Sequence, residues 1–342
     1  MGLPLRDLVH PEELPWEALA GRSLAVDGYN ALYQFLATIR QPDGRLFTDA
    51  EGRVTSHLMG LLNRTASLLA EGVRPVWVMD GKAPDRKAGT LSQRFRVKER
   101  AEEAWKEALA AGDLELARRK AAATSHLSRE MVAEAVELLA ALGVPSVQAP
   151  SEGEAQAARM AAEGLVWAAA SEDYDCLLFG APRLVRGLAA RAPKGKALGA
   201  QVIDRAQLLS TLGISSEELL LIGLLIGNDY SDGARGFGPK RALKLAQEHL
   251  GLEASLRRAG LDPEAVAPVA ELFRTPEVAT VAAPVFRAVD PDAVIRLLVD
   301  RHGFSDTRVR AALERVRRSP HPASEPPRGR QQRLDAFAPE AS

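Results

Sequence analysis

Seven acidic residues lie at the ends of predicted strands or at breaks after strongly apolar runs. They are Asp27, Asp80, Glu152, Glu154, Asp173, Asp175 and Asp229. Any one of them is explained equally well as a turn former or a helix cap. Gathered in one cleft, the set would repel itself strongly unless hard cations were present. The set as a whole therefore predicts a metal-binding carboxylate cluster.

Magnesium is the ion that best suits such a cluster. It prefers oxygen ligands, keeps several waters and commonly needs only one or two direct carboxylates, so seven acids suit two partly hydrated ions. Two ions about 4 Å apart can activate a water and stabilise the leaving oxygen in phosphodiester hydrolysis. No catalytic His, Ser or Cys is then required, and the six histidines lack the spacing typical of metal ligands.

Two pairs of these acids are spaced two residues apart. Glu152 and Glu154 form one pair, and Asp173 and Asp175 form the other. In a strand such a pair shares one face, whereas in a helix its members point to different faces. A turn or the start of a helix before Glu152 could still direct both glutamates into a cleft. Ser151 and Glu154 also match a helix capping box, which is a structural alternative for Glu154.

Basic and glycine residues near the acids suggest contacts with phosphate. Lys87 and Arg94 follow Asp80 and, being seven apart, share one face of a helix. They could hold a phosphate and offset its developing charge, although a solvated basic face is the alternative. A glycine-rich turn follows Asp229 and contains Gly236, Gly238, Pro239, Lys240 and Arg241. Its amides favour an anion, although a plain helix-loop-helix turn is the alternative.

The elements that must position these groups alternate along the chain. Short apolar runs that end near Asp27, Asp80 and Asp173, and a further run before the two glutamates, predict strands. Residues 54–72 and 128–143 show apolar residues at helical spacing. This alternation predicts an α/β fold with a mostly parallel sheet and helices on both faces. Ligands of such sheets gather at the carboxyl ends of the strands, where these acids fall.

The remaining segments differ in character. Residues 86–122 are highly charged and helical, which alone is typical of a solvated helical pair. From residue 215 onward the pattern is helical, and from 319 the chain is rich in Pro and polar residues, so we expect a disordered tail over 319–342.

Composition is that of an ordinary globular protein, with 342 residues, 46% of them apolar and 26% charged. No apolar run reaches the roughly 20 residues that span a bilayer, and the acidic N-terminus does not resemble a secretory signal, so we expect an intracellular protein without membrane contact. The lone cysteine, Cys176, excludes an internal disulfide, and we expect it to be buried. The net charge of −1 leaves room for a nucleic-acid partner if the acids are concentrated at metals.

Several motifs, in this order, resemble the flap endonucleases of the archaeal and eukaryotic type, within the structure-specific 5′-nuclease superfamily. The segments are MGL, VDGYNALYQFL, VMDGKAPDRKAGTLSQR, APSEGEAQAA, SEDYDCLLFG and GNDYSDGARGFGPKRA. The likeness covers about residues 1–318 and implies one nuclease domain with a PIN-like core. It implies one Mg²⁺ held mainly by Asp27, Asp80, Glu152 and Glu154. A second would be held mainly by Asp173, Asp175 and Asp229, and Mn²⁺ would substitute.

The resemblance also implies contacts with DNA. Lys87 and Arg94 match a catalytic basic pair at the base of a helical arch, residues 86–122. Tyr33 matches an aromatic that stacks on the reacting nucleotide. Gly2 would lie near the active site. Residues 223–250 would form a helix-two-turn-helix with a K⁺ at its loop carbonyls, and its DNA-binding residues would be Gly236, Gly238, Lys240 and Arg241.

The tail resembles a motif that binds a sliding clamp of the PCNA kind, with Gln331, Leu334 and Phe337 at the expected spacing. Ala338 stands where a second aromatic is usual, so we expect weak clamp binding. The lack of a long lysine-rich tail favours a prokaryotic, archaeal cytoplasm over a nucleus.

The function that the resemblance implies is removal of 5′ flaps from branched DNA by a monomeric enzyme in replication and repair, with 5′-3′ exonuclease activity. One alternative is another branch of the superfamily, a 5′ exonuclease or an enzyme of bubbles or four-way junctions. A non-catalytic DNA-binding or clamp-associated scaffold is the other, and it would gain nothing from seven acids beside phosphate.

Overall fold

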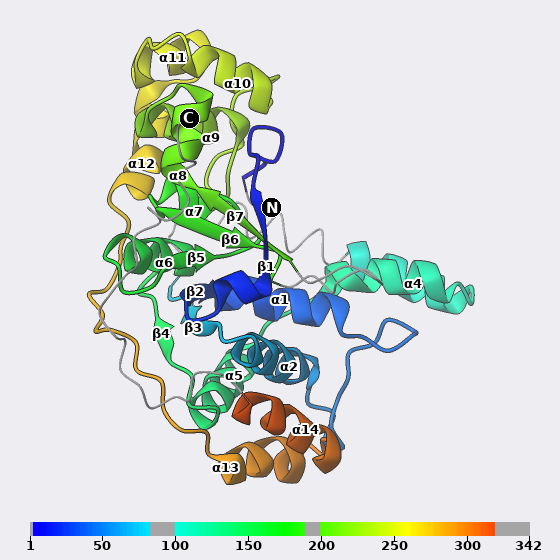
Figure 1. Ribbon diagram of the computed structural model, residues 1–342. Coiled ribbons are helices and arrows are strands. Elements are labelled where there is room, and N and C mark those ends of the chain that lie inside the picture. The colour runs from blue at the N-terminus through cyan, green and yellow to red at the C-terminus, as the bar shows by residue number, and fades with distance from the viewer. Residues whose placement is uncertain (1–2, 83–99, 189–198, 319–342) are drawn as a thin grey trace, which may run out of the picture.

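The computed structural model describes residues 3–82, 100–188 and 199–318, which form a sheet flanked by helices (Figure 1). The strands are β1 (Glu12–Pro15), β2 (Ser23–Asp27), β3 (Arg74–Met79), β4 (Ser146–Gln148), β5 (Ala168–Ala170), β6 (Arg183–Arg186) and β7 (Gly199–Asp204). Their order is β1-β7-β6-β5-β2-β3-β4. The strands from β6 to β4 pair in parallel, whereas β7 and β1 pair antiparallel. The predicted mostly parallel sheet is confirmed, but the sequence analysis did not predict β1, β6 or β7.

Strands β2 and β3 at the centre of the sheet are buried along nearly their whole length. Such continuous apolar runs are typical of parallel strands that helices cover. Asp27 pairs with Val78 in β3, and Val26 pairs with Ala170 in β5. The carboxyl ends of three neighbouring strands therefore meet at one edge of the sheet.

The helices around the sheet include α1 (Gly28–Thr38), α2 (Ser56–Ala70), α5 (Arg129–Ala141) and α6 (Gly153–Ala162). The helices predicted over 54–72 and 128–143 are thus α2 and α5. Gly143 follows α5 with a φ of +70°, and a Cβ there would lie 2.2 Å from the carbonyl oxygen of Arg287. Glycine is required there both for the left-handed backbone and for the close approach.

Helices of the second half form the two ends of the molecule in Figure 1. One end holds α8 (Arg205–Leu212), α9 (Ser216–Ile226), α10 (Pro239–Ala246), α11 (Leu252–Arg258) and α12 (Pro263–Arg274). The other holds α13 (Pro291–Ile295), the π-helical turn η4 (Arg296–Arg301) and α14 (Asp306–Arg317), which packs on α2. No single helix in the described ranges is long and apolar enough to cross a membrane, although α8 and α9, bent by 82°, pass that test as a pair.

The predicted helical arch is described only from residue 100 onward. Residues 100–110 are helical, and α4 (Leu114–Ala121) and the short η3 (Ala122–Thr124) follow. Helix α4 stands away from the body of the molecule (Figure 1). Trp105 anchors the segment, because its indole N–H donates to the carbonyl oxygen of Asp43 at 3.1 Å. The described part thus agrees with a largely solvated helical pair.

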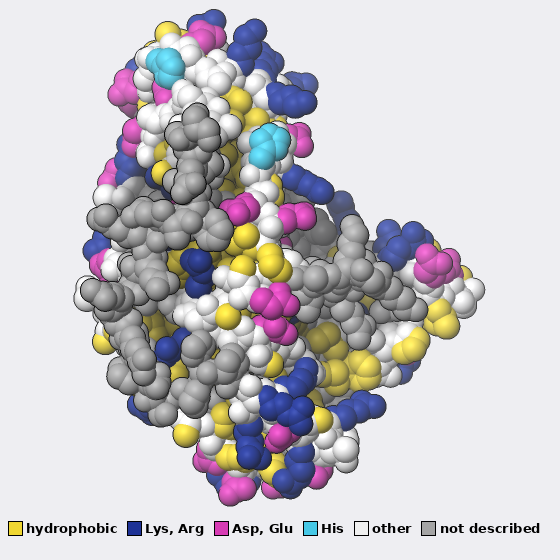
Figure 2. Space-filling view, in the orientation of Figure 1, with side chains coloured by type: hydrophobic (Ala, Val, Ile, Leu, Met, Phe, Trp, Pro, Cys, Tyr) yellow, Lys and Arg dark blue, Asp and Glu magenta, His cyan; other side chains and the backbone are white. Residues whose placement is uncertain are grey.

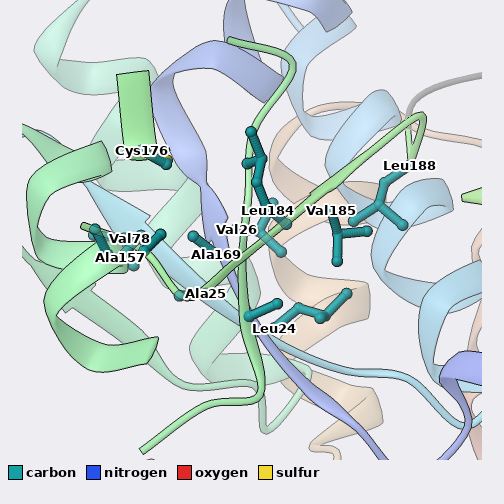
Figure 3. Packing of buried hydrophobic residues seen from close by; sticks show 14 of the residues in the cluster. Leu24, Ala25, Val26, Val78, Ala157, Ala169, Cys176, Leu184, Val185 and Leu188 are labelled. Atoms are coloured by element: carbon teal, nitrogen blue, oxygen red, sulfur yellow. The ribbon is translucent and has the colours of Figure 1, made fainter. Parts of the chain in front are cut away.

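One buried apolar cluster extends through the described ranges, from Leu3 to Val316. Figure 3 shows part of it, where Leu24 and Val26 of β2 lie near Val185 of β6. Cys176 is fully buried at the margin of this view, as expected for an apolar thiol. The predicted tail, 319–342, lies outside the described residues.

Candidate metal centre

Three of the acids lie at the ends of strands or within a few residues beyond them. Asp27 ends β2 and is also the N-cap of α1, where its carboxylate accepts a hydrogen bond from the backbone N–H of Asn30. Asp80 follows the last residue of β3. Asp173 lies three residues beyond the end of β5, and the Asn30 amide donates to it at 3.0 Å. The acids therefore gather at the carboxyl edge of the sheet, as predicted.

The remaining acids lie where helices begin or end. Glu152 is the N-cap of α6, and Glu154 is in its first turn. Asp175 is the first residue of α7 (Asp175–Leu178), and Asp229 lies in the turn after α9. Neither closely spaced pair is on a strand, so the start of a helix directs each pair towards the sheet edge.

The capping box considered for Glu154 is wrong. Helix α6 begins at Gly153, and its N-cap has no side-chain hydrogen bond. Glu154 Oε1 instead accepts from the hydroxyl of Ser171 at 2.9 Å. That hydroxyl also lies 3.1 Å from Asp27 Oδ2, so one serine links two of the acids.

Asp80 is held against the start of α6. The backbone N–H of Gly153 donates to Asp80 Oδ1 at 2.9 Å. A Cβ on Gly153 would lie 2.5 Å from that same oxygen, so only glycine permits the approach. Asp80 is thereby placed beside Gly153, whose neighbours in sequence are Glu152 and Glu154.

The other acids meet around Tyr230. Burial raises the pKa of the Tyr230 hydroxyl, and Glu152, Asp229 and Asp175 raise it further. Glu152 acts both through its charge and through a hydrogen bond with the phenol. Asp175 also accepts a hydrogen bond from the backbone N–H of Leu3, at 3.2 Å. Six of the predicted acids are therefore linked by one another's charge or through Tyr230, and Asp80 joins them through the backbone N–H of Gly153.

The electrostatics of this group favour a cation. Burial raises the pKa of Asp27 to about 6, and the charges of Asp173 and Glu152 add to the rise. Burial, and then Asp175, Asp27 and Asp173, hold the pKa of Glu154 well above its ordinary value. Buried carboxylates that lie close together repel one another, which destabilises their charged forms. A bound divalent cation would relieve that repulsion.

The chemistry of the donors suits a hard cation, because all seven predicted side chains are carboxylates. Magnesium prefers oxygen ligands, takes one or two direct carboxylates and keeps most of its waters. In the ranges 3–82, 100–188 and 199–318, however, no three His, Cys, Asp or Glu side chains form a group that could hold a metal ion as they stand.

The other predicted DNA-contact residues are placed only in part. Tyr33 lies on α1 and is 37% exposed. Gly236 has a φ of +80°, and Gly238 is the N-cap of α10. Arg241 donates to the carbonyl oxygen of Gly236 at 3.2 Å, and Lys240 is exposed. The turn before α10 is thus a glycine-rich turn that leads into a helix with Pro239 in its first turn, as predicted. Gly2, Lys87, Arg94, Gln331, Leu334 and Phe337 lie outside the described residues.

Basic side chains are present at both ends of the molecule. Figure 2 shows Lys and Arg over α10 and α11 at one end and near α14 at the other, with Asp and Glu among them. Lys240 and Lys244 on α10 are exposed, whereas Arg310 on α14 is paired with Asp306. The two lysines of α10 therefore offer positive charge beside the turn at Gly236.

Four polar residues of the site were missed in the sequence. They are Asn30, Gln34, Ser171 and Tyr230, which contact the acids or one another. Only their positions close to the acids along the chain could have indicated them. Asn30 stands at the third helical position after an N-capping aspartate, and Ser171 directly follows a strand.

Two family models and several known proteins match the chain. The XPG N-terminal domain matches residues 5–102, and the XPG I-region matches residues 143–229. Flap endonuclease 1 of Aeropyrum pernix is 47% identical over 98% of this chain and 99% of its own length. That of Hyperthermus butylicus is 44% identical over the same shares.

Solved structures show the same architecture. Flap endonuclease-1 from Methanococcus jannaschii superposes with a TM-score of 0.73 at 35% identity, covering 92% of this chain and 98% of that one. The catalytic core of Rad2 in complex with DNA substrate, at 23% identity and a TM-score of 0.71, shares the fold over 91% of this chain and 97% of its own. Because relatives of this identity match nearly its whole length, the chain belongs to the flap endonuclease family.

Proposed function

We propose that this protein is a magnesium-dependent, structure-specific nuclease that removes 5′ flaps from branched DNA during replication and repair. The observation that carries the proposal is the convergence of acids from segments between Asp27 and Asp229: six of them act on one another or on Tyr230, and Asp80 is held at the start of α6. Family membership supports the nuclease activity, and the carboxylate oxygens of the donors are the ligands that magnesium prefers.

The acids would hold two Mg²⁺ ions, which Mn²⁺ would replace. One ion would bind mainly to Asp27, Asp80, Glu152 and Glu154. The second would bind mainly to Asp173, Asp175 and Asp229. When bound, the ions would supply an activated water and stabilise the leaving oxygen. The product would carry a 5′-phosphate, beside a 3′-hydroxyl on the other fragment.

Other parts of the chain would hold the DNA. Tyr33 lies on α1, the helix that Asp27 caps, and its exposed ring offers a stacking surface to an unpaired terminal base. The turn at Gly236 to Arg241 presents amides and cations to duplex phosphates, and its carbonyls would bind K⁺. Lys87 and Arg94 would contact the scissile phosphate, and Gly2 would approach the site.

The proposal also includes the enzyme's oligomeric state, its cellular compartment and its partner. The enzyme would act as a monomer in a prokaryotic cytoplasm, and its tail motif of Gln331, Leu334 and Phe337 would bind a sliding clamp. It would also degrade 5′ ends as an exonuclease.

A cleavage assay with several substrates tests this proposal. The protein is incubated with a labelled 5′-flap duplex, a plain single strand and a four-way junction, each with Mg²⁺ and with chelator. We expect cleavage of the flap near its base, in the presence of Mg²⁺ only. Preference for the four-way junction would assign the chain to another branch of the superfamily. Absence of any cleavage with Mg²⁺ would support the scaffold alternative.

A further inference from the structure

Three polar side chains that carry no charge link the acids of the site. We infer that Ser171, Asn30 and Gln34, here called the carboxylate frame, are positioning residues that set the spacing between the two groups of metal ligands. The inference rests on the proposed metal site but concerns how that site is built.

Ser171 is the centre of the frame. It directly follows β5, is 7% exposed, and accepts a hydrogen bond from the backbone N–H of Asp173 at 3.1 Å. Its hydroxyl lies 3.1 Å from Asp27 Oδ2 and 2.9 Å from Glu154 Oε1. One oxygen thus contacts two acids of the first ligand group and the backbone of an acid of the second.

The Ser171 hydroxyl has fewer hydrogens to donate than it has carboxylate neighbours. A serine hydroxyl has one hydrogen, so it can donate to only one carboxylate at a time. Asp27 and Glu154 are both within hydrogen-bond distance of that single donor. Ser171 therefore lies within reach of both carboxylates and donates to one of them at a time, so it holds the two oxygens close together.

Asn30 makes the second link between the groups. Its backbone N–H donates to Asp27 Oδ1 at 3.0 Å, and its side-chain Nδ2 donates to Asp173 Oδ2 at 3.0 Å. Asp27 belongs to the first ligand group and Asp173 to the second. Because both donors come from one residue of α1, the helix fixes the separation of the two acids.

Gln34 sets the orientation of the Asn30 amide. Gln34 Nε2 donates to Asn30 Oδ1 at 2.8 Å, one helical turn along α1. With its oxygen occupied, Asn30 presents its NH₂ group to Asp173. An NH₂ group cannot ligate a cation, so Asn30 acts through Asp173.

Metal binding without DNA provides the main test. Mn²⁺ affinity is measured by calorimetry on the full chain for the wild type, Ser171→Ala and Ser171→Thr. Loss of a group that orients a metal ligand typically weakens binding about 10- to 100-fold. We expect that loss for Ser171→Ala and near wild-type affinity for Ser171→Thr, which keeps the hydroxyl. Ser210→Ala, an exposed serine on α8, is the matched control.

A second variant keeps the test independent of folding at Ser171. Gln34→Ala changes none of the acids and none of the residues that donate to them. It removes only the hydrogen bond that holds the Asn30 amide, which becomes free to rotate. We expect weaker Mn²⁺ binding, and cleavage that recovers when Mg²⁺ is raised, so the half-saturating Mg²⁺ concentration rises while the maximal rate is largely kept. Wild-type Mn²⁺ affinity in both Ser171→Ala and Gln34→Ala would overturn the inference.

The readout also separates this inference from the proposed function. If the wild type binds Mn²⁺ but cuts no branched DNA, the proposed activity fails while the frame is still tested by the affinities. If the wild type cuts but the variants match it in affinity and Mg²⁺ dependence, the frame alone fails.

Discussion

His302 Nδ1 lies 2.8 Å from Asp49 Oδ2, and this contact joins the end of η4 to the loop before α2. Both side chains are almost fully buried, at 0% and 1% exposure. The opposite ring nitrogen of His302 lies 3.2 Å from Glu134 of α5, and His57 of α2 lies 3.5 Å from the same carboxylate. A polar cluster therefore ties the C-terminal helices to the body of the protein, away from the acids of the metal site.

This cluster predicts a loss of stability in mild acid. Burial, and then the neighbouring His302, lower the pKa of His57 to about 4. The unfolded chain takes up that proton more readily than the folded one, so the contribution is complete above about pH 6.5 and is lost as pH falls towards 4. The full effect is about 3 kcal/mol. Chemical denaturation from pH 7 to 4.5 should show a smaller loss for His57→Asn than for the wild type.

A control separates this effect from general acid denaturation. His126→Asn, at an exposed histidine, should lose stability in parallel with the wild type. The carboxylate of Asp49 also affects the stability of the protein, but at a lower pH than His57. Burial raises its pKa, but hydrogen bonds from His302 and Arg53 outweigh burial and lower it to about 2, so its contribution is lost only as pH falls from about 4 towards 2. Equal slopes for wild type and His57→Asn between pH 6.5 and 4.5 would contradict the assignment to His57.

Asp175→Asn tests the second ligand group. The change keeps the size of a side chain that is 4% exposed but removes its charge. We expect cleavage to fall by more than about 100-fold, beyond what the loss of an orienting partner costs. Binding to a flap junction in Ca²⁺, measured by fluorescence anisotropy, should persist. Asp292→Asn, at an exposed acid of α13, should cut normally; normal cutting by Asp175→Asn would remove Asp175 from the proposed ligands.

Gly153→Ala should damage the site without unfolding the protein. Its Cβ would lie 2.5 Å from Asp80 Oδ1 and 3.5 Å from the carbonyl oxygen of Val78, so the Asp80 carboxylate must move. Alanine is favoured over glycine within a helix by about 1 kcal/mol, which offsets part of the strain. We expect a small change in Tm but about 10-fold weaker Mn²⁺ binding. Gly199→Ala, where the nearest atom is 3.4 Å away, is the control, and unchanged affinity in Gly153→Ala would refute the close approach.

Lys240→Ala should weaken DNA binding in a salt-dependent way. Lys240 is exposed at the start of α10, where the helix amides favour a phosphate. A lysine that contacts phosphate contributes about one unit to the slope of log K against log salt. Titrations of a duplex at several KCl concentrations should show that slope reduced by about 1. An unchanged slope, like that expected for Arg159→Ala on α6, would place Lys240 outside the interface.

Phe337→Ala tests the tail. The motif already lacks an aromatic at Ala338, so Phe337 should provide much of its remaining apolar anchor. We expect weak binding of the full chain to a PCNA-like clamp in surface plasmon resonance, and its loss in the variant. Nuclease activity on a flap in the absence of clamp should be unchanged. Identical clamp affinity in the wild type and the variant would exclude the motif.

Local patterns in the sequence were sufficient to predict where the acids gather. Asp27 and Asp80 close short apolar runs that predict strands, and parallel strands end at one edge of a sheet. The antiparallel strands β1 and β7 were not predicted; β1 has only four residues and is mostly exposed. Their pairing depends on how the sheet grows beyond β6, which no local pattern encodes.

The contacts between the acids and their neighbours depend on packing and could not be predicted. Asn30 and Asp173 are 143 residues apart, and Ser171 and Asp27 are 144 apart. The capping box at Ser151 and Glu154 failed for the same reason. Glu154 instead contacts Ser171, which directly follows β5 and is 17 residues away along the chain, and this contact replaces the local hydrogen bond that the pair would make.

The lone cysteine gives this protein an internal reporter of opening at its acidic edge. Cys176 is fully buried, its Sγ lies 3.8 Å from Glu154 Oε1, and burial, together with that carboxylate, raises the pKa of the thiol. A maleimide can therefore react only when local opening exposes Cys176 in α7. Because the chain contains no second thiol, the rate of labelling would time that opening directly, with no engineered probe.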